Sequence, residues 1–305
     1  MSAGAPPRIA VLRCVRIPSF VTWEVTELEP FFDDDRLLIE EFARRGVHAE
    51  GVGWSDPDVD WKQFDMAIIR STWDYIDARD EFLEVLARID ATCRLFNPLE
   101  AVRWNSNKSY LLDLPAWDIP TVPTFRAEQA DPARVIEALR ACRSTGAVIK
   151  PTIGAAGAGV RRVGIDELDG ELAKLASGGT TCANHIVQPL IESVRTEGEW
   201  SFIYIDRQLR HVVLKQPTGG DYRINVVYGG TAVRAEPTPD DIRQADAIFA
   251  RLPYDTLFAR LDLVRLGGRL VVMEVEIIEP VLYFDLVPES VPILTTAALA
   301  RFRGA

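Results

Sequence analysis

Cysteine, histidine and long apolar runs are scarce in this chain of 305 residues. The four cysteines stand far apart and form no Cys-x-x-Cys pair, so zinc sites of that type and a disulfide framework are excluded. The three histidines and scattered serines show no triad spacing, which leaves nucleophilic hydrolases without support. No run of 18 apolar residues occurs, and the N-terminus lacks the apolar stretch of a signal peptide. We therefore expect a soluble, cytoplasmic protein with no membrane partner.

Positive charge is also in short supply. Lysine and arginine number 34 against 45 aspartates and glutamates, which gives a formal net charge of −11. Such a surface repels phosphate backbones, so we expect no nucleic-acid partner. Any anionic ligand must instead be met by a local cluster of Lys or Arg. The length allows two or three subdomains around real cores.

The first third alternates between strand and helix patterns. Apolar runs predict three strands, at residues 8–15, 47–53 and 65–70. Apolar residues at helical spacing predict helices at 33–45 and 78–89. This order is typical of a small parallel sheet with ligand-facing loops at the strand ends. Residues 1–104 are therefore predicted to form an α/β domain.

The pattern changes near residue 105 and becomes richer in strands. We predict a central subdomain over residues 105–184 and a C-terminal subdomain over residues 185–305. The fold class is therefore α+β, with two α+β subdomains after a small α/β start. The expected strands lie at 121–125, 147–150, 160–163, 185–188, 200–206, 209–216, 222–228, 231–236, 257–264 and 270–278, and the expected helices at 108–114, 132–142, 240–251 and 291–303.

A glycine-rich loop follows the strand expected at residues 147–150. Its small residues leave backbone N–H groups bare, so a phosphate can approach closely. The chain has no Gly-Lys-Ser/Thr, and a strand rather than a helix follows, so neither a P-loop nor a dinucleotide fingerprint fits. What remains is a hairpin able to close over a triphosphate, or a plain glycine hairpin. Lys150 and Lys215 each close an apolar strand and are either phosphate ligands or solvated surface residues.

Acidic residues give the sharpest signal. Strand period two puts Glu274 and Glu276 on one face, and puts Arg260 and Asp262 on one face of another strand. If the two strands pair, three acids converge with an arginine beside them. Divalent cations commonly relieve such repulsion, and oxygen ligands suit Mg²⁺. The alternative is a half-exposed sheet face with solvated carboxylates.

Two further segments suggest ligand contacts. Arg223 and Asn225 would share one strand face, where an arginine can neutralise a transferring phosphoryl group or form a structural salt bridge. The apolar segment 188–191 leaves a strand, and its free backbone groups could read an adenine edge. Glu199 downstream could bind a ribose hydroxyl. The alternative for this segment is an ordinary interdomain crossing.

The loop after the strand at 65–70 is a candidate substrate site, because ligands bind beyond the carboxyl ends of parallel strands. Asp74 could meet the ammonium group of a zwitterionic amino acid. Hydrogen-bond donors for its other end could come from Arg70, Ser71, Thr72 and Tyr75. The alternative is that Trp73 and Tyr75 only pack a domain interface.

Taken in order, these elements resemble the ATP-grasp superfamily, in particular its glutathione synthetase and RimK-type ligases. The resemblance covers residues 105–285, with a weaker match before them, and it implies ATP and Mg²⁺ as cofactors. The family usually shows Glu-x-Asn where this chain has Glu274-Val275-Glu276. The resemblance implies the following assignments: phosphate contacts at Lys108, Lys150, Gly154, Ala155, Ala156, Gly157 and Lys215; adenine at Gln188, Pro189, Leu190 and Ile191; ribose at Glu199; catalysis at Arg223, Arg260 and Asn225; metal at Asp262, Glu274 and Glu276.

A narrower resemblance is to the cyclo-ligases of D-cycloserine biosynthesis, carried by the RSTWDY segment at 70–75 and by EVEIIEP at 274–280. It implies that ATP activates a carboxylate as an acyl phosphate and that a nitrogen of the same molecule closes the ring. Two alternatives stay open: an intermolecular ligase joining an amino acid to an amine or peptide, and a nucleotide-binding module without turnover. The expected partner is a small amino-acid-like molecule. A homodimer is left open.

Overall fold

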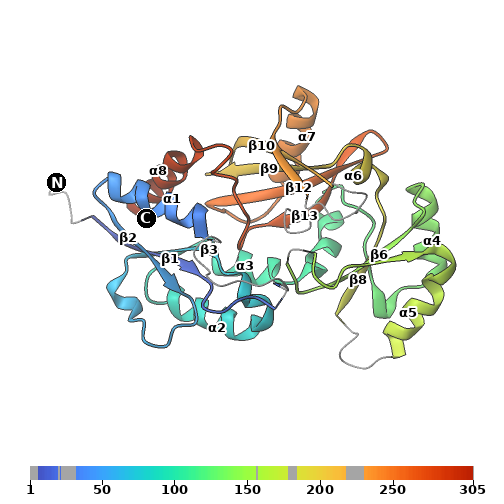
Figure 1. Ribbon diagram of the computed structural model, residues 1–305, viewed down its shortest axis with the longest axis horizontal. Helices are drawn as coiled ribbons and strands as arrows, with labels where there is room; N and C mark the ends of the chain where they lie inside the picture. Colours follow the sequence, from blue (N-terminus) through green and yellow to red (C-terminus); the bar gives the residue numbers. More distant parts are fainter. Residues whose placement is uncertain are drawn as a thin grey trace.

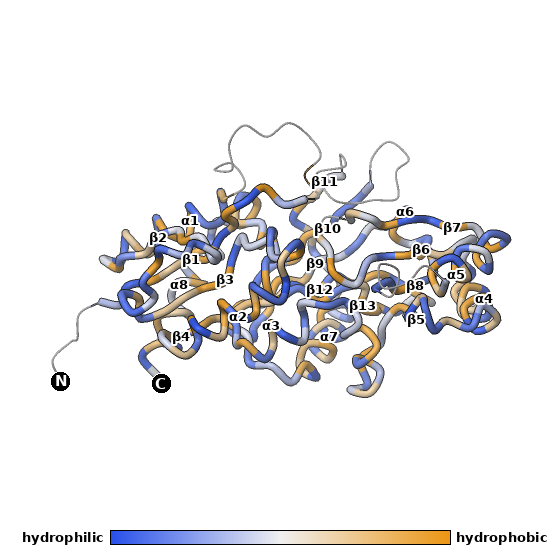
Figure 2. The backbone as a smooth tube through the Cα atoms, turned by 90° about the horizontal axis from the view of Figure 1, so that it is seen from below, coloured by the Kyte–Doolittle hydropathy of each residue, from blue (hydrophilic) through white to orange (hydrophobic). Residues whose placement is uncertain are grey.

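The described part of the chain contains three β-sheets with helices packed around them. A computed structural model describes residues 6–19, 21, 32–155, 157–177, 184–217 and 230–304. The fold is the predicted mixture of helices and sheets, with strands of the first sheet parallel and those of the other two antiparallel. In Figures 1 and 2 the molecule is elongated. The parallel sheet that contains β1 lies at one end, the sheet that contains β6 and β8 lies at the other, and the sheet that contains β9 to β13 lies between them.

The first sheet has the strand order β2 (His48–Gly53), β1 (Arg8–Arg13), β3 (Met66–Ser71) and β4 (Arg94–Phe96). Alternate residues of β1 and β3 face opposite sides, as strand period two requires. One side packs against α1 (Asp33–Arg44) and α8 (Ser290–Arg303), and the other against α2 (Arg79–Asp90). Three aspartates in the first turn of α1 suit the positive end of its dipole. The predicted α/β pattern of this region is confirmed.

The second sheet carries the glycine-rich hairpin. Its order is β5 (Phe125–Arg126), β8 (His185–Pro189), β6 (Gly146–Pro151) and β7 (Arg161–Gly164), covered by α4 (Pro132–Ala141) and α5 (Leu168–Ser177). The antiparallel β6–β7 pair confirms the predicted hairpin. A boundary at residue 185 would separate β8 from the sheet to which it is hydrogen bonded. The pairing therefore places β8 with the middle region, because sheet membership depends on the neighbouring strands and not on position in the chain.

The third sheet holds most of the candidate site. Its strands run in the order β11 (Thr231–Arg234), β10 (Gln208–Gln216), β9 (Glu199–Ile205), β12 (Phe258–Leu266) and β13 (Arg269–Glu276). The remaining helices are α3 (Leu99–Asn105), α6 (Glu192–Thr196) and α7 (Pro239–Phe249). The helix predicted at 108–114 is a 3₁₀ turn at Lys108–Leu112. The strand predicted at 222–228, with Arg223 and Asn225, lies outside the described residues.

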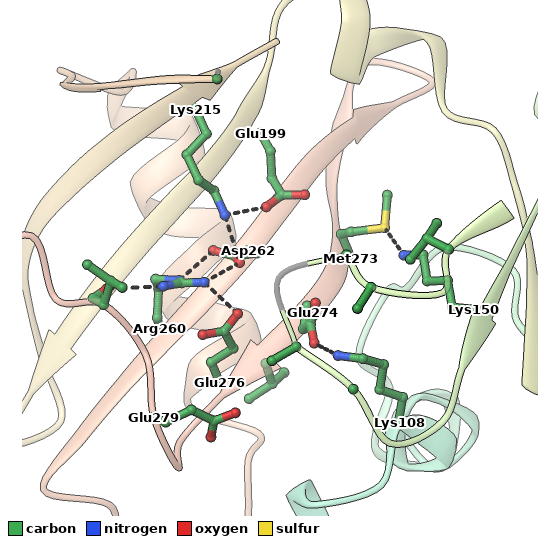
Figure 3. A pocket seen from close by; sticks show the side chains of 18 of the residues that line it. Lys108, Lys150, Glu199, Lys215, Arg260, Asp262, Met273, Glu274, Glu276 and Glu279 are labelled. Atoms are coloured by element: carbon green, nitrogen blue, oxygen red, sulfur yellow. Dashed lines mark hydrogen bonds and ion pairs between the residues drawn. The ribbon is translucent and has the colours of Figure 1, made fainter. Parts of the chain in front are cut away.

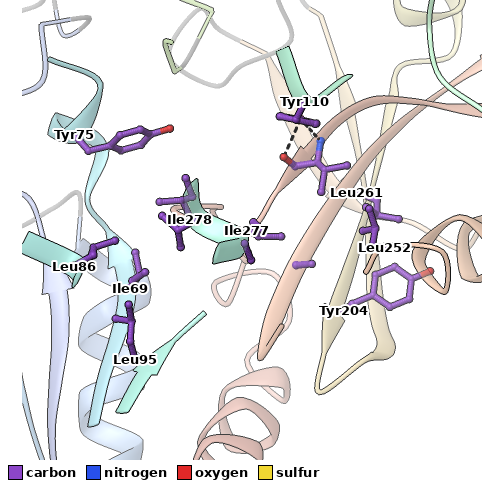
Figure 4. Close-up of a cluster of buried hydrophobic side chains, with 14 of the residues drawn as sticks. Ile69, Tyr75, Leu86, Leu95, Tyr110, Tyr204, Leu252, Leu261, Ile277 and Ile278 are labelled. Atoms are coloured by element: carbon purple, nitrogen blue, oxygen red, sulfur yellow. Dashed lines mark hydrogen bonds between the residues drawn. The ribbon is translucent and has the colours of Figure 1, made fainter. Parts of the chain in front are cut away.

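One apolar cluster joins the first and third sheets. Figure 4 shows Ile277 and Ile278, directly after β13, between Ile69 of β3 and Leu261 of β12. Asn97 reinforces this junction, since its buried amide donates to the carbonyls of Phe258 (2.9 Å) and Ile277 (2.7 Å). The junction holds the chain after β13 in a defined place. In the described part of the chain, no helix combines the length and the apolar character needed to span a lipid bilayer.

Candidate active site

A cleft of about 1250 Å³ opens between the three sheets and gathers most of the predicted site residues. Figure 3 shows its charged side chains, which come from the 3₁₀ turn at Lys108–Leu112, from β6, from β9, β10, β12 and β13, and from the segment directly after β13. Ala156 lies outside the described residues. The predicted residues that line the cleft are Tyr75, Lys108, Lys150, Gly154, Ala155, Gly157, Gln188, Pro189, Leu190, Ile191, Glu199, Lys215, Arg260, Asp262, Glu274 and Glu276.

The acidic residues meet because β12 and β13 pair in the predicted register. Arg260 lies opposite Glu276, and Asp262 lies opposite Glu274. Asp262 is 2% exposed and accepts both ends of the Arg260 guanidinium, at 3.0 Å each. Burial tends to raise the pKa of Asp262, but the charges of Arg260 and Lys215 outweigh burial and hold this pKa well below its usual range.

A second pair lies across β9 and β10. The Lys215 ammonium is 2.5 Å from a Glu199 oxygen and 2.9 Å from an Asp262 oxygen. Burial raises the pKa of Glu199, and the Lys215 charge opposes that shift. Burial lowers the pKa of Lys215, but Asp262 and Glu199 together raise it above its ordinary value. Lys215 therefore stays charged.

The other two lysines approach the cleft from its opposite side. Lys108 forms an ion pair with Glu274. Lys150 reaches the Met273 sulfur at 3.4 Å and forms no ion pair within the described part of the chain. Burial lowers its pKa. A partly buried ammonium without an anionic partner is a site to which a phosphate oxygen is attracted.

Excess negative charge remains on the Glu276 side. Burial raises the pKa of Glu276 to about 7, although Arg260 opposes the shift at 2.5 Å. Burial and the charge of Glu276 raise the pKa of Glu279 to about 8. Glu276 has the Arg260 guanidinium as its partner, whereas Glu279 forms no ion pair within the described ranges. This side of the cleft is therefore prepared for positive charge.

The predicted metal acids face Lys and Arg side chains. Asp262 and Glu276 contact Arg260, and Glu274 contacts Lys108. Within the described ranges, no three acidic, histidine or cysteine side chains are grouped closely enough to hold one metal ion. Their carboxylate oxygens and their shared cleft nevertheless have the chemistry that Mg²⁺ prefers.

Comparison with known proteins agrees with this geometry. Residues 122–285 match the family described as prokaryotic glutathione synthetase, ATP-grasp domain, and residues 9–97 match that described as D-cycloserine synthetase DcsG, N-terminal domain. The chain belongs to the ATP-grasp ligases. It is an ATP-dependent ligase, so the alternative of a nucleotide-binding module without turnover is set aside.

Individual relatives extend this assignment. The ligase is 30% identical over 261 residues to the cycloserine biosynthesis protein DcsG of Streptomyces lavendulae, covering 80% of this chain and 85% of that protein. It is 28% identical over 178 residues to a glutathione synthetase of Ralstonia nicotianae, covering 55% of this chain and 47% of that protein. The crystal structure of D-cycloserine synthetase DcsG superposes with a TM-score of 0.80 at 27% identity, over 97% of this chain and 99% of that one.

The segment predicted to read an adenine edge lines the cleft of this ATP-grasp ligase, but one of its residues is not free. The Leu190 N–H donates to the Gly146 carbonyl at 2.9 Å, and the Leu190 carbonyl accepts from the Ser144 hydroxyl at 2.7 Å. The expectation of free backbone groups is therefore wrong at Leu190, because the chain directly after β8 is already bonded to Gly146 of β6 and to Ser144. The Gln188 side-chain oxygen is buried without a partner in the described part of the chain.

The predicted substrate loop needs correction at most of its positions. Arg70, Ser71 and Thr72 are at most 2% exposed and do not line the cleft. The Asp74 carboxylate accepts from the backbone N–H groups of Val15 (3.0 Å) and Arg16 (3.1 Å) and from the Trp54 indole. Its oxygens hold the chain after β1 in place, so they do not reach a substrate. Of the five residues predicted to bind substrate, Tyr75 lines the cleft.

Arg70 acts as a clamp between the first and third sheets. Its guanidinium stacks on the Phe258 ring at 5.0 Å and lies 3.5 Å from Asp34 and 3.8 Å from Asp35. Strand periodicity predicted that Arg70 ends a strand, but not which way its side chain turns. Among the cleft residues that were not assigned a role from the sequence are Trp73 and Glu279. The acidic run that carries Glu274 and Glu276 extends to Glu279, and that was the available signal.

Asp35 beside this clamp should make stability depend on pH. Burial raises the pKa of Asp35 to about 7, with Arg70 opposing the shift. The folded protein then keeps a proton that the unfolded chain has lost, so stability falls as pH rises from about 4 to about 7. Asp35→Asn should remove this loss, making the variant about 2 kcal/mol more stable relative to wild type at pH 7.5 than at pH 5. Urea unfolding at both pH values measures this difference in stability. The same pH dependence of stability in the variant and in wild type would contradict the raised pKa of Asp35.

Proposed function

We propose that this ligase uses ATP to phosphorylate the carboxylate of O-ureido-D-serine and closes the product into D-cycloserine. The observation that carries the proposal is the relationship of the whole chain, including the substrate-side region at residues 9–97, to D-cycloserine synthetase. Trp73 and Tyr75 of that region line the same cleft as the lysines and acids of the ATP-grasp region. The nucleotide and an amino-acid-like substrate can therefore meet there.

The cleft offers contacts for each part of ATP and for its metal ion. Lys150, Lys108 and the small residues Gly154, Ala155 and Gly157 would hold the ATP phosphates, and Gln188 to Ile191 with Glu199 would hold the nucleoside. Asp262, Glu274 and Glu276 would hold Mg²⁺, which when bound neutralises phosphate charge. Arg260 and Lys215 keep Asp262 ionised and in place. The roles of Arg223 and Asn225 stay predictions.

The reaction balances in two stages. The substrate carboxylate takes the terminal phosphoryl group of ATP, and ADP leaves. The ureido nitrogen bonded to oxygen then attacks the acyl carbon, which forms the ring C–N bond and expels phosphate. Addition of water to the carbamoyl group on that nitrogen releases carbon dioxide and ammonia and leaves D-cycloserine. The nucleophile and the acyl group belong to one molecule, so ring closure benefits from proximity.

The purified protein should therefore convert O-ureido-D-serine with ATP and Mg²⁺ to D-cycloserine, ADP and phosphate in equal amounts, without an added amine. Mass spectrometry of the ring product together with phosphate release measures this. The enzyme with Glu274→Gln serves as the control for contaminating ligases. If product forms only when a separate amine is supplied, ring closure is wrong and the enzyme is an intermolecular ligase.

A further inference from the structure

The segment after β13 is held by residues of the N-terminal region rather than by its own strand. The Trp73 indole donates to the Glu279 carbonyl at 3.1 Å, and Arg70 donates to the Pro280 carbonyl at 3.2 Å. The Asp34 carboxylate accepts from the backbone N–H groups of Leu282 (2.9 Å) and Phe284 (3.2 Å). The substrate-side region therefore sets where the Glu279 side chain can lie.

The Glu279 carboxylate lies in the cleft without an ionic partner. Glu274 is paired with Lys108 and Glu276 with Arg260, but Glu279 forms no ion pair within the described part of the chain. Figure 3 shows its carboxylate beyond Glu276, on the side of the cleft away from Lys150. Tyr75, which is 5% exposed, also faces this acid, whose charge adds to burial in raising the pKa of the phenol.

Keeping a carboxylate ionised in this position is unfavourable in free energy unless a cation binds to it. Glu279 is partly buried, and a charged group removed from water without an ionic partner is unfavourable; the charge of Glu276 adds repulsion. The Tyr75 hydroxyl forms a hydrogen bond with the Glu279 carboxylate but carries no positive charge. An ammonium group would supply the charge that is missing and add a charge-assisted hydrogen bond.

We propose that Glu279 binds the ammonium group of the amino-acid substrate and so selects substrates that carry a free amine next to the reacting carboxylate. The inference rests on the proposed function, because it assumes a substrate with that amine. In this proposal Glu279 binds the ammonium group in place of Asp74, because the Asp74 oxygens are already bonded to the chain after β1. Arg70 and Trp73 are then positioning residues, since they hold the backbone that carries Glu279.

The experiment compares two ligands by equilibrium binding, which does not require turnover. O-ureido-D-serine and its analogue without the amine, 3-(ureidooxy)propanoic acid, are titrated calorimetrically into protein loaded with Mg²⁺ and a non-hydrolysable ATP analogue. Glu279→Gln keeps the shape and removes the charge. It should raise the Kd of O-ureido-D-serine about 10- to 100-fold, the usual worth of a charged hydrogen bond, and leave the Kd of the analogue unchanged.

Asp285→Asn is the matched control, because Asp285 also lines the cleft but is exposed to solvent. It should change neither Kd. Equal weakening of both ligands by Glu279→Gln, or a changed Mg²⁺ requirement for nucleotide binding, would overturn the ammonium site. Unchanged binding of O-ureido-D-serine would also overturn it. Wild-type protein that binds the amine selectively but makes no cycloserine would leave Glu279 in place and refute the proposed function.

Discussion

Replacing Glu274 with glutamine should lower the rate of ATP-dependent product formation by about 10³-fold, because the metal contributes several kcal/mol to stabilising the transferring phosphoryl group. Glu274 lies opposite Asp262 and pairs with Lys108, so it touches both the proposed metal site and a proposed phosphate ligand. Glutamine preserves the shape but removes the charge that attracts Mg²⁺. Phosphate release under saturating ATP measures the effect.

The fold of the Glu274→Gln variant should stay intact, since the side chain is only partly buried and its neighbours on β13 keep their pairing. Thermal unfolding checks this point. Glu192→Gln is the matched control, because Glu192 also lines the cleft but is exposed and pairs with Arg195 on the surface. It should retain near-normal activity. Near-normal phosphate release from the Glu274 variant would remove the metal assignment.

Replacing Asn97 with alanine should destabilise the protein by about 3 kcal/mol, because each buried polar group left unpaired costs roughly 1–3 kcal/mol. The Asn97 oxygen accepts from the Leu257 N–H at 2.6 Å, and its amide donates to Phe258 and Ile277. The side chain thereby ties the end of the first sheet to β12 and to the segment after β13. Urea unfolding followed by fluorescence measures the loss.

Loss of Asn97 should also loosen the cleft, because Ile277 lies two residues before Glu279. The variant should therefore show a higher KM for the carboxylate substrate even where it remains folded. Gln208→Ala provides the comparison, since it removes an exposed amide from β10. If Asn97→Ala unfolds at the wild-type urea concentration, the junction between the sheets does not depend on this side chain.

Local patterns were enough to predict most elements around the site. Apolar runs located β1, β3, β6 and the strands of the third sheet to within a few residues. Strand period two placed Arg260 and Asp262 on one face and Glu274 and Glu276 on another, and the β12–β13 register confirmed both. Short elements such as β4 and α6 were missed because so few residues carry no clear period.

Side-chain destinations could not be predicted in the same way. The loop Arg70–Tyr75 was correctly placed at a strand end, yet Arg70 turns into the core and Asp74 binds backbone amides of the chain after β1. These outcomes depend on partners far away in the sequence. Periodicity describes only which face a residue takes on its own strand.

The sequence by itself therefore determined the order of elements, the alternation that groups the acids, and the absence of P-loop and triad chemistry, because these are properties of neighbouring residues. Only the tertiary structure decided which cation meets which acid. Lys108 and Glu274 are 166 residues apart, and Lys215 and Asp262 are 47 apart. It also placed β8 beside β6 and carried Glu279 into the cleft. Packing of distant strands sets these contacts, and no local pattern encodes that packing.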